Sequence, residues 1–215
     1  MNEFTSREDW LSWRRKGVGA SDVPSIMNAS PYRTVLDIYN DKINTEKEEE
    51  KSNYIMELGN KLEPIARSRY ELLNDADFPA ANFVHASKTH YRASLDGYNV
   101  ELNKAIEIKY VGKNFFEECP DKYYPQIQYQ YAVTLCESID LVQINNMNEV
   151  KSFLVLRNID YIIAMLERVD WFWDCVLNKK EDEILAAMPP KKEKKVKEIK
   201  AKEVKEKKPR KKKGE

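Results

Sequence analysis

The fold depends on residues 94–110, which read Ser94-Leu-Asp-Gly-Tyr-Asn-Val-Glu-Leu-Asn-Lys-Ala-Ile-Glu-Ile-Lys-Tyr110 and predict a strand, a turn and a second strand. Side chains alternate across the predicted strand Ala105–Tyr110, so Glu107 and Lys109 share one face. The Asp-Gly pair that begins at Asp96 can end one strand and begin a hairpin, which brings its carboxylate level with Glu107. The stretch therefore predicts two carboxylates and an ammonium group in one place.

Converging carboxylates indicate a candidate metal site. Asp96, Glu107 and the backbone carbonyl of Ile108 offer oxygen ligands, which suit Mg²⁺ or Mn²⁺. Lys109, as a general base or as a cation that holds the attacking water, completes a site for metal-assisted phosphodiester hydrolysis. The same residues also fit a hairpin with a solvated ion pair, because structural ion pairs often imitate functional ones. The rest of the chain has to decide between these two interpretations.

The length of 215 residues suits one domain with a substantial core. No apolar run approaches the roughly 20 residues that span a bilayer, and the sequence does not start like a signal peptide. We therefore expect a cytoplasmic protein with no membrane partner. The three cysteines, Cys119, Cys136 and Cys175, are odd in number and lack a Cys-x-x-Cys spacing, which argues against a disulfide framework and a structural zinc site.

Charge divides the chain into an acidic body, residues 1–190, and a basic tail, residues 191–215. The tail holds 14 Lys and Arg against 5 Asp and Glu, which leaves 22 against 31 in the body. With almost nothing to bury, the tail is predicted to be disordered or transiently helical. It could hold DNA through phosphate contacts or serve as a solubility or partner-binding extension. The acidic body argues against a simple nucleic-acid-binding module but not against a nuclease.

A second candidate site lies near the N-terminus, at Arg14 and Ser21. A short helix is predicted to begin at the N-cap Ser6 and to bury Trp10 and Trp13. Ser21 is the expected N-cap of the next helix, and helix N-termini bind anions, so a phosphate can sit between Ser21 and the guanidinium of Arg14 or Arg15. The local sequence alone favours a simpler interpretation, in which Ser21 only caps a helix and both arginines are solvated.

Residues 54–73 predict a long amphipathic helix that is interrupted at its glycine and its proline. Glu63 lies on or near the apolar face of this helix. Its carboxylate is either half of a partly buried ion pair with Lys61 or Arg67, or a third ligand for the site at Asp96. Periodicity leaves both alternatives open.

The remaining elements follow from short alternating runs and from apolar stripes. We expect strands at 82–87, 91–95, 138–145 and 150–156, and helices at 35–43, 123–136 and 159–178. The last of these helices should bury Ile162, Leu166, Val169, Trp173 and Val176.

The predicted helix 123–136 is unusually polar and aromatic. Gln126 and Gln130 are four residues apart and share a face of it, whereas Gln128 must point elsewhere or lie at the edge of that face.

Six motifs, in this order and rough spacing, resemble the YqaJ-like viral recombinase family, which is similar to bacteriophage lambda exonuclease. They span about Trp10 to Ile144, and no single one is specific, but six in register are. The motifs are Arg14 with Gly-x-Gly-Ala-Ser21-Asp, Ser-Pro-Tyr32, Glu57-Leu-Gly-Asn-Lys-Leu-Glu63-Pro, Ser94-Leu-Asp96-Gly, Glu107-Ile-Lys109, and Pro125-Gln-Ile-Gln-Tyr-Gln130.

The resemblance implies an α/β (α+β) fold with a restriction-endonuclease-like core, in which a central mixed sheet is flanked by helices, and it makes the body a nuclease domain. It also implies two Mg²⁺ ions, with Mn²⁺ possible, held by Asp96, Glu107, the Ile108 carbonyl and Glu63. Lys109 would orient or activate the attacking water.

The resemblance further implies that the glutamine helix lies along the active-site cleft. Gln128 is the closest match to the catalytic-site glutamine of the family, with Gln126 beside it on the DNA. Arg14 and Ser21 match positions that grip a 5′ phosphate in lambda exonuclease.

Relatives are 5′ to 3′ exonucleases that act on duplex DNA ends as ring-shaped trimers and pass the 3′ strand to a single-strand annealing protein. We therefore expect a Mg²⁺-dependent exonuclease of phage-type recombination, a homotrimer in the cytoplasm of a bacterial host cell.

Two alternatives stay open. One is an endonuclease or nickase of the same fold, because a metal centre alone does not specify DNA ends. The other is a catalytically inactive DNA-binding subunit, although intact Asp96, Glu107 and Lys109 argue against it.

The sequence departs from the family pattern by having Ser-Leu-Asp-Gly for Ser-Pro-Asp-Gly and by continuing Glu-x-Lys with Tyr-Val rather than Cys-Pro. Both departures lie outside the proposed ligands.

Overall fold

The computed structural model describes residues 3–44 and 54–189. Residues 45–53, which the sequence predicts to be a charged linker in an exposed loop, lie outside these ranges, as does the basic tail. None of the helices in the described ranges is both long and apolar enough to cross a membrane.

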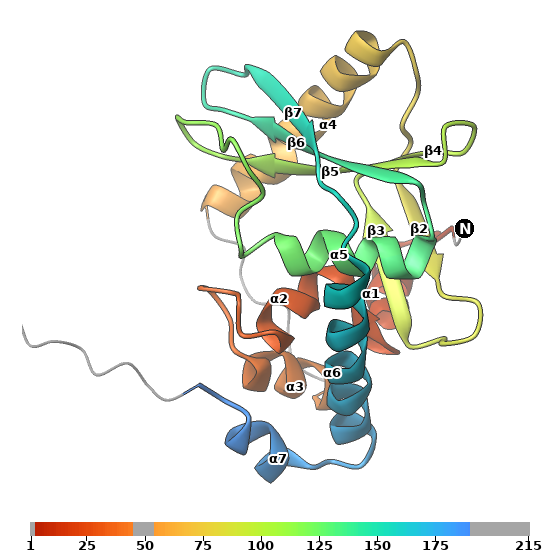
Figure 1. Cartoon of the computed structure of the whole chain (residues 1–215), viewed down its shortest axis with the longest axis vertical. Coiled ribbons are helices and arrows are strands. Elements are labelled where there is room, and N and C mark those ends of the chain that lie inside the picture. The colour runs from red at the N-terminus through yellow and green to blue at the C-terminus, as the bar shows by residue number, and fades with distance from the viewer. Residues whose placement is uncertain (1–2, 45–53, 190–215) are drawn as a thin grey trace, which may run out of the picture.

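The described chain folds into helices and strands; it begins and ends with helices, and most of its strands lie in the middle of the sequence (Figure 1). In chain order these are α1 (Arg7–Arg15), β1 (Val18–Gly19), the 3₁₀ helix η1 (Ala20–Asp22), α2 (Val23–Ile26), α3 (Val35–Ile43), α4 (Tyr54–Asn74), β2 (Ala81–Val84), β3 (Tyr91–Leu95), β4 (Gly97–Asn99), β5 (Lys104–Tyr110), α5 (Tyr124–Thr134), β6 (Ser138–Ile144), β7 (Val150–Leu154), α6 (Ile159–Leu177) and α7 (Glu181–Ala186).

The strands form two sheets of mixed direction. One has the order β1-β3-β2 and the other the order β4-β5-β6-β7. Strands β1 and β3 pair in parallel, as do β5 and β6, and the remaining pairs are antiparallel. Asp96 is the one residue between β3 and β4, so it stands where the chain passes from the first sheet to the second. The predicted mixed α/β fold is confirmed, with the strands divided between two sheets.

Helices α4 and α5 cover opposite faces of the four-stranded sheet (Figure 1). Ile106 and Ile108 of β5 pack on Leu62, Ala66 and other apolar side chains of α4. The alternate face of β5 carries Glu107 toward α5. The period-two alternation predicted for this strand is therefore confirmed.

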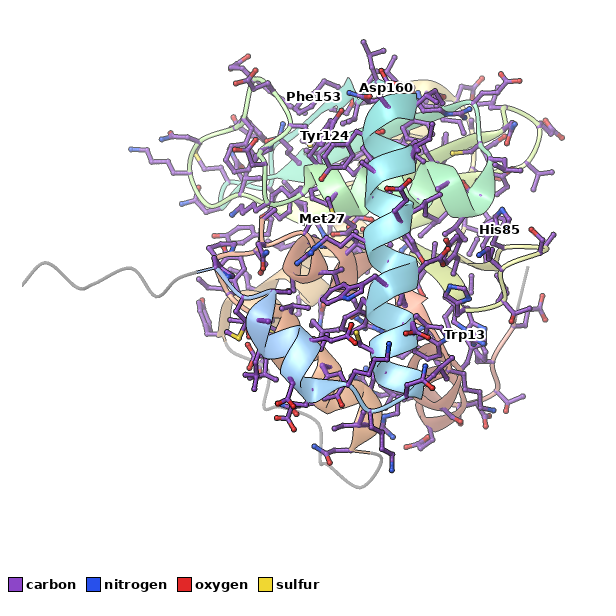
Figure 2. The ribbon with its side chains drawn as sticks, turned by 60° about the horizontal axis from the view of Figure 1, so that its bottom comes forward. Trp13, Met27, His85, Tyr124, Phe153 and Asp160 are labelled. Carbon is purple, nitrogen blue, oxygen red and sulfur yellow. The ribbon has the colours of Figure 1, made fainter. Side chains whose placement is uncertain are left out.

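The larger hydrophobic core lies between α5, α6 and the N-terminal helices. Figure 2 shows α6 along its length, with Tyr124 of α5 near its first turn at Asp160. The rings of Tyr124 and Tyr161 pack edge to face with centroids 5.0 Å apart. The glutamine helix is thus enclosed by the sheet on one side and by α6 on another.

Two predicted helix starts are confirmed, and one is wrong. The Ser6 side chain accepts a hydrogen bond from the backbone of Asp9, and Thr34 caps α3 in the same way. Ser21, however, lies inside η1 rather than at a helix N-cap. The N-cap of α2 is instead the buried Asp22. Its carboxylate accepts the backbone N–H of Gly19, the N-cap of η1, at 3.0 Å.

The predicted interruption of the long helix is also wrong, since α4 runs unbroken through Gly59 and Pro64. A proline inside a helix removes one backbone hydrogen bond. Burial of Leu62, Ala66 and Tyr70 on both sides of it against the sheet holds the helix together.

Burial differs from the prediction on α1 and α6. No residue of α1 is fully buried, so Trp10 and Trp13 are only partly covered. On α6 the structure buries Met165, Phe172 and Cys175 in addition to the expected Ile162, Val169 and Val176, and leaves Leu166 and Trp173 half-buried. The unpredicted α7 explains part of the difference, because it packs on α6 and its buried Ile184 joins the same core.

Replacing Gly97 by alanine should destabilise the protein by roughly 1–3 kcal/mol, the usual cost of overpacking a core. A Cβ at this position would lie 2.7 Å from Ile106 Cγ1 and 2.7 Å from the backbone oxygen of Phe78, so the second sheet would have to shift. Urea denaturation would measure the change. Gly59→Ala is the matched control: a Cβ there meets nothing within 4 Å, and we expect a helix stabilised by about 0.5–1 kcal/mol. Equal effects of the two substitutions would contradict the close packing at Gly97.

Candidate active site

Glu107 is the centre of the site. It is 2% exposed, and three side chains donate hydrogen bonds to its carboxylate. Lys109 Nζ and Gln126 Nε2 lie 2.5 and 2.6 Å from Oε1, and Gln130 Nε2 lies 2.5 Å from Oε2. A carboxylate has about four lone-pair positions, so three donors leave one for another ligand.

Asp96 reaches the same strand from the junction of the two sheets. Its Oδ2 accepts the backbone N–H of Ile108 at 2.7 Å. The N–H and C=O of one strand residue point to the same side, so the Ile108 carbonyl also faces the Asp96 side of β5. The structure thus brings together Asp96, Glu107, Ile108 and Lys109, as predicted.

The carboxylates influence one another electrostatically. Part of Asp96 reaches the surface, yet burial raises the pKa of its carboxyl group well above the usual range, and the negative charges of Glu107 and Glu63 raise it further. The Lys109 ammonium opposes this shift. Burial would lower the pKa of Lys109, but the charges of Glu107 and Asp96 more than offset it and raise that pKa. Acidic groups therefore crowd at this point of the fold, and folding favours the protonated form of Asp96.

Glu63 stands at the edge of the cluster. Its Oε1 pairs with Arg67 at 2.5 Å, which confirms one of the two partners expected from the sequence. Burial raises the pKa of Glu63, the Arg67 charge lowers it, and the Glu107 charge raises it. This third carboxylate, on helix α4, is therefore within electrostatic reach of the other two.

The donor set fits a divalent cation in chemistry. Within residues 3–44 and 54–189, no three His, Cys, Asp or Glu side chains are gathered tightly enough to form a metal site by themselves. The candidate ligands are nevertheless all oxygens, and Asp96 is held among like charges that a bound cation would offset. Asp96, Glu107 and the Ile108 carbonyl are the candidate ligands, and Glu63 lies within electrostatic reach of both carboxylates.

The expectation that Gln128 lies at this site is wrong. Its Nε2 donates to the Leu156 carbonyl at 2.8 Å, and its Oε1 accepts the Asn158 N–H at 2.8 Å. Successive residues turn by about 100° around a helix, so the face that carries Gln126 and Gln130 points away from that of Gln128. Gln130 takes the place at Glu107, a contact that the shared face with Gln126 could have revealed.

The N-terminal candidate pair also comes together. Arg14 Nη2 donates a hydrogen bond to Ser21 Oγ and lies 3.4 Å from Asp22 Oδ1. Lys42 Nζ lies 2.7 Å from the other Asp22 oxygen. Burial raises the pKa of Asp22, but the positive charges of Lys42 and Arg14 outweigh this effect and bring the pKa down to about 2. The sequence did not predict this buried acid, which anchors Arg14 beside Ser21.

These residues lie within a known family pattern. Residues 9–137 match the model of the YqaJ-like viral recombinase domain. The chain belongs to this family. A curated relative, the uncharacterized protein YqaJ of Bacillus subtilis (strain 168), is 27% identical over 139 residues. The match covers 61% of this chain and 44% of that protein, so the chain spans less than half of its relative's length.

Solved structures share the fold of this YqaJ-like domain. The alkaline exonuclease LHK-Exo from Laribacter hongkongensis matches with a TM-score of 0.62 at 23% identity, covering 83% of this chain and 95% of that one. Its complex with dAMP gives 0.61 at 24% identity, with the same coverage. A phage related exonuclease from Haemophilus somnus 129PT gives 0.55 at 12% identity, covering 76% and 96%. At these identities the likeness is one of fold.

Asp96→Asn should stabilise the metal-free protein at neutral pH. A carboxyl group whose pKa is raised by folding binds more protons folded than unfolded, so its ionisation lowers stability as pH rises through the folded pKa. In EDTA at pH 7 we expect a higher melting temperature for the variant than for wild type. This difference in melting temperature should vanish as the pH falls toward the usual pKa of an aspartate. About 1 kcal/mol corresponds to some 2–4 °C in a domain of this size.

Asp140→Asn is the control for this measurement. Asp140 accepts hydrogen bonds from Tyr70 at 2.7 Å and pairs with Lys104 at 2.8 Å, so its neutralisation should destabilise the protein. A lower melting temperature for both variants would show that Asp96 is an ordinary structural acid.

Proposed function

We propose that this protein is a Mg²⁺-dependent exonuclease that degrades linear duplex DNA from 5′ ends and leaves 3′ single strands for phage-type homologous recombination. The observation that carries the proposal is the buried Glu107 carboxylate, held by Lys109, Gln126 and Gln130 next to Asp96. Membership of the YqaJ-like viral recombinase family supports it, as do the names of the exonucleases that share the fold.

In this proposal Asp96, Glu107, the Ile108 carbonyl and Glu63 hold two Mg²⁺ ions, or Mn²⁺. Bound there, the ions would polarise the phosphodiester and lower the pKa of water. Lys109 donates a hydrogen bond in the observed geometry, so its ammonium suits the binding of an oxygen atom of the attacking water or of the phosphate. The two glutamines keep the Glu107 carboxylate from rotating, which fixes the direction in which its remaining lone pair points.

Arg14 and Ser21 would bind the 5′ phosphate of the shortened strand. A guanidinium binds phosphate oxygens through paired N–H donors, and the Ser21 hydroxyl adds one more. Asp22 and Lys42 would hold Arg14 in place behind them. Recognition of this end group is what would make the enzyme an exonuclease.

The proposal also includes a homotrimer, a single-strand annealing partner and a bacterial cytoplasmic location, all of which rest on the family resemblance.

The protein should degrade linear duplex DNA in the presence of Mg²⁺ and spare closed circular DNA, as followed on gels over time. Lys109→Ala and Asp96→Ala should remove nearly all of this activity, because loss of one such group costs several kcal/mol of transition-state stabilisation, about 10²–10³ in rate. Cutting of the circle would favour the endonuclease or nickase alternative. If both substrates survive, the chain is an inactive DNA-binding subunit.

The same assay with 5′-phosphorylated and 5′-hydroxyl ends tests the proposed polarity. Wild type should prefer the phosphorylated end, and Arg14→Ala should lose that preference. An unchanged preference would remove Arg14 from the proposed phosphate site.

Gln130→Leu should raise the Mg²⁺ concentration needed for half-maximal rate by about 10–100-fold, the usual effect of removing a group that orients a metal ligand. Gln128→Leu is the matched control on the same helix. It breaks the bonds to Leu156 and Asn158, so it should lower the melting temperature and leave the Mg²⁺ dependence of the folded enzyme unchanged. The reverse pattern would restore Gln128 to the active site.

A further inference from the structure

Lys122 lies in an unusual setting at the start of the glutamine helix. Its ammonium nitrogen is 4.7, 5.4 and 5.9 Å from the ring centroids of Tyr123, Tyr32 and Phe116, and it donates a hydrogen bond to the Tyr32 hydroxyl at 3.1 Å. Among the described residues it forms no ion pair with a carboxylate. A cation that is packed on rings keeps its charge available for an anion.

The Tyr123 ring connects this cluster to the candidate active site. Lys109 Nζ lies 5.3 Å from its centroid, and Lys122 Nζ lies 4.7 Å from it. Two ammonium groups therefore contact one aromatic ring, and one of them donates a hydrogen bond to Glu107. The Tyr123 ring therefore places Lys122 close to Lys109 of the candidate active site.

Tyr32 offers the other half of a nucleotide contact. It is 75% exposed, although its hydroxyl is tied to Lys122. It belongs to the turn before α3, whereas Lys122 precedes α5, so the pair joins two segments far apart in the sequence. Exposed aromatic rings stack on nucleic-acid bases of any sequence, and a neighbouring cation can bind the backbone phosphate next to the stacked base.

We propose that Tyr32 and Lys122 form a binding site for the DNA strand next to the scissile phosphate, with Lys122 on a backbone phosphate and the Tyr32 ring stacked on an unpaired base. This site rests on the proposed nuclease function and adds to it the region where the strand is gripped as a single strand. Because stacking and phosphate contacts carry no base pattern, the site is independent of DNA sequence.

A purely structural role for the pair makes a different prediction. If Lys122 only ties the turn at Tyr32 to α5, its removal would lower stability and leave DNA affinity unchanged. A binding role would lower affinity with little change in melting temperature, because both side chains are at least partly exposed.

The test measures binding of a fluorescent duplex with a short single-stranded end, by anisotropy in EDTA so that nothing is cleaved. Lys122→Gln should weaken binding about tenfold at low salt and reduce the slope of log affinity against log salt by about 0.7–0.9, the loss of one phosphate contact. Tyr32→Ala should cost about tenfold or more through lost stacking. Lys122→Arg should restore affinity, since a guanidinium keeps the charge and packs on rings.

Lys151→Gln is the matched control, because Lys151 also lies over a ring, Phe115 at 5.0 Å, without contacting Tyr123. When linear duplex DNA is degraded in Mg²⁺, Lys122→Gln and Tyr32→Ala should show a higher KM than wild type and a kcat near the wild-type value.

Wild-type affinity and salt slope in Lys122→Gln would overturn the proposal, as would an equal loss in the Lys151 control. Either result beside a wild type that degrades linear DNA leaves the nuclease function intact. If wild type binds the probe but degrades no DNA, the proposed nuclease function fails. The DNA affinities of the Lys122 and Tyr32 variants then still decide whether this binding site exists.

Discussion

The buried carboxylate of Glu107 is the interaction on which the rest of the structure depends. A charge inside a protein is tolerated only when it is paired and hydrogen-bonded, and here the donors come from two elements, β5 itself and α5. This requirement explains why the largely buried α5 carries Gln126 and Gln130 on the face toward the sheet. An apolar helix would pack equally well against the sheet, but it would leave the carboxylate with Lys109 alone.

The second constraint is the junction between the sheets. Asp96 occupies the single position between β3 and β4, so its backbone is held by strands on both sides. The close approach of Phe78 and Ile106 at Gly97 fixes the chain immediately after it. Its carboxylate can therefore stand among like charges without swinging away, a strain that the fold imposes and that a cation would relieve. Rigid placement of a destabilised acid is common at functional sites.

Sequence reasoning succeeded where the determinant is local. The caps Ser6 and Thr34, the alternation in β5 and the helical spacing of Gln126 and Gln130 were all predictable. It failed where distant packing decides. Packing on the sheet keeps α4 continuous through Pro64, and the ion pair that Asp22 forms with Lys42 joins η1 to α3. Gln128 was misplaced because family matching placed it on the site, although its helical position pointed away.

The alternating contacts of α5 have a mechanical consequence. One face of this helix grips Glu107 through Gln126 and Gln130, and the other holds the chain that leads into α6 through Gln128. Because α5 has polar contacts on two opposite faces, a displacement of the segment that enters α6 would rotate α5 about its axis. Such a rotation would weaken the hydrogen bonds of both glutamine amides to the Glu107 carboxylate. Substitutions at the remote contact between α5 and the segment that enters α6 would therefore disturb the Glu107 carboxylate without touching it.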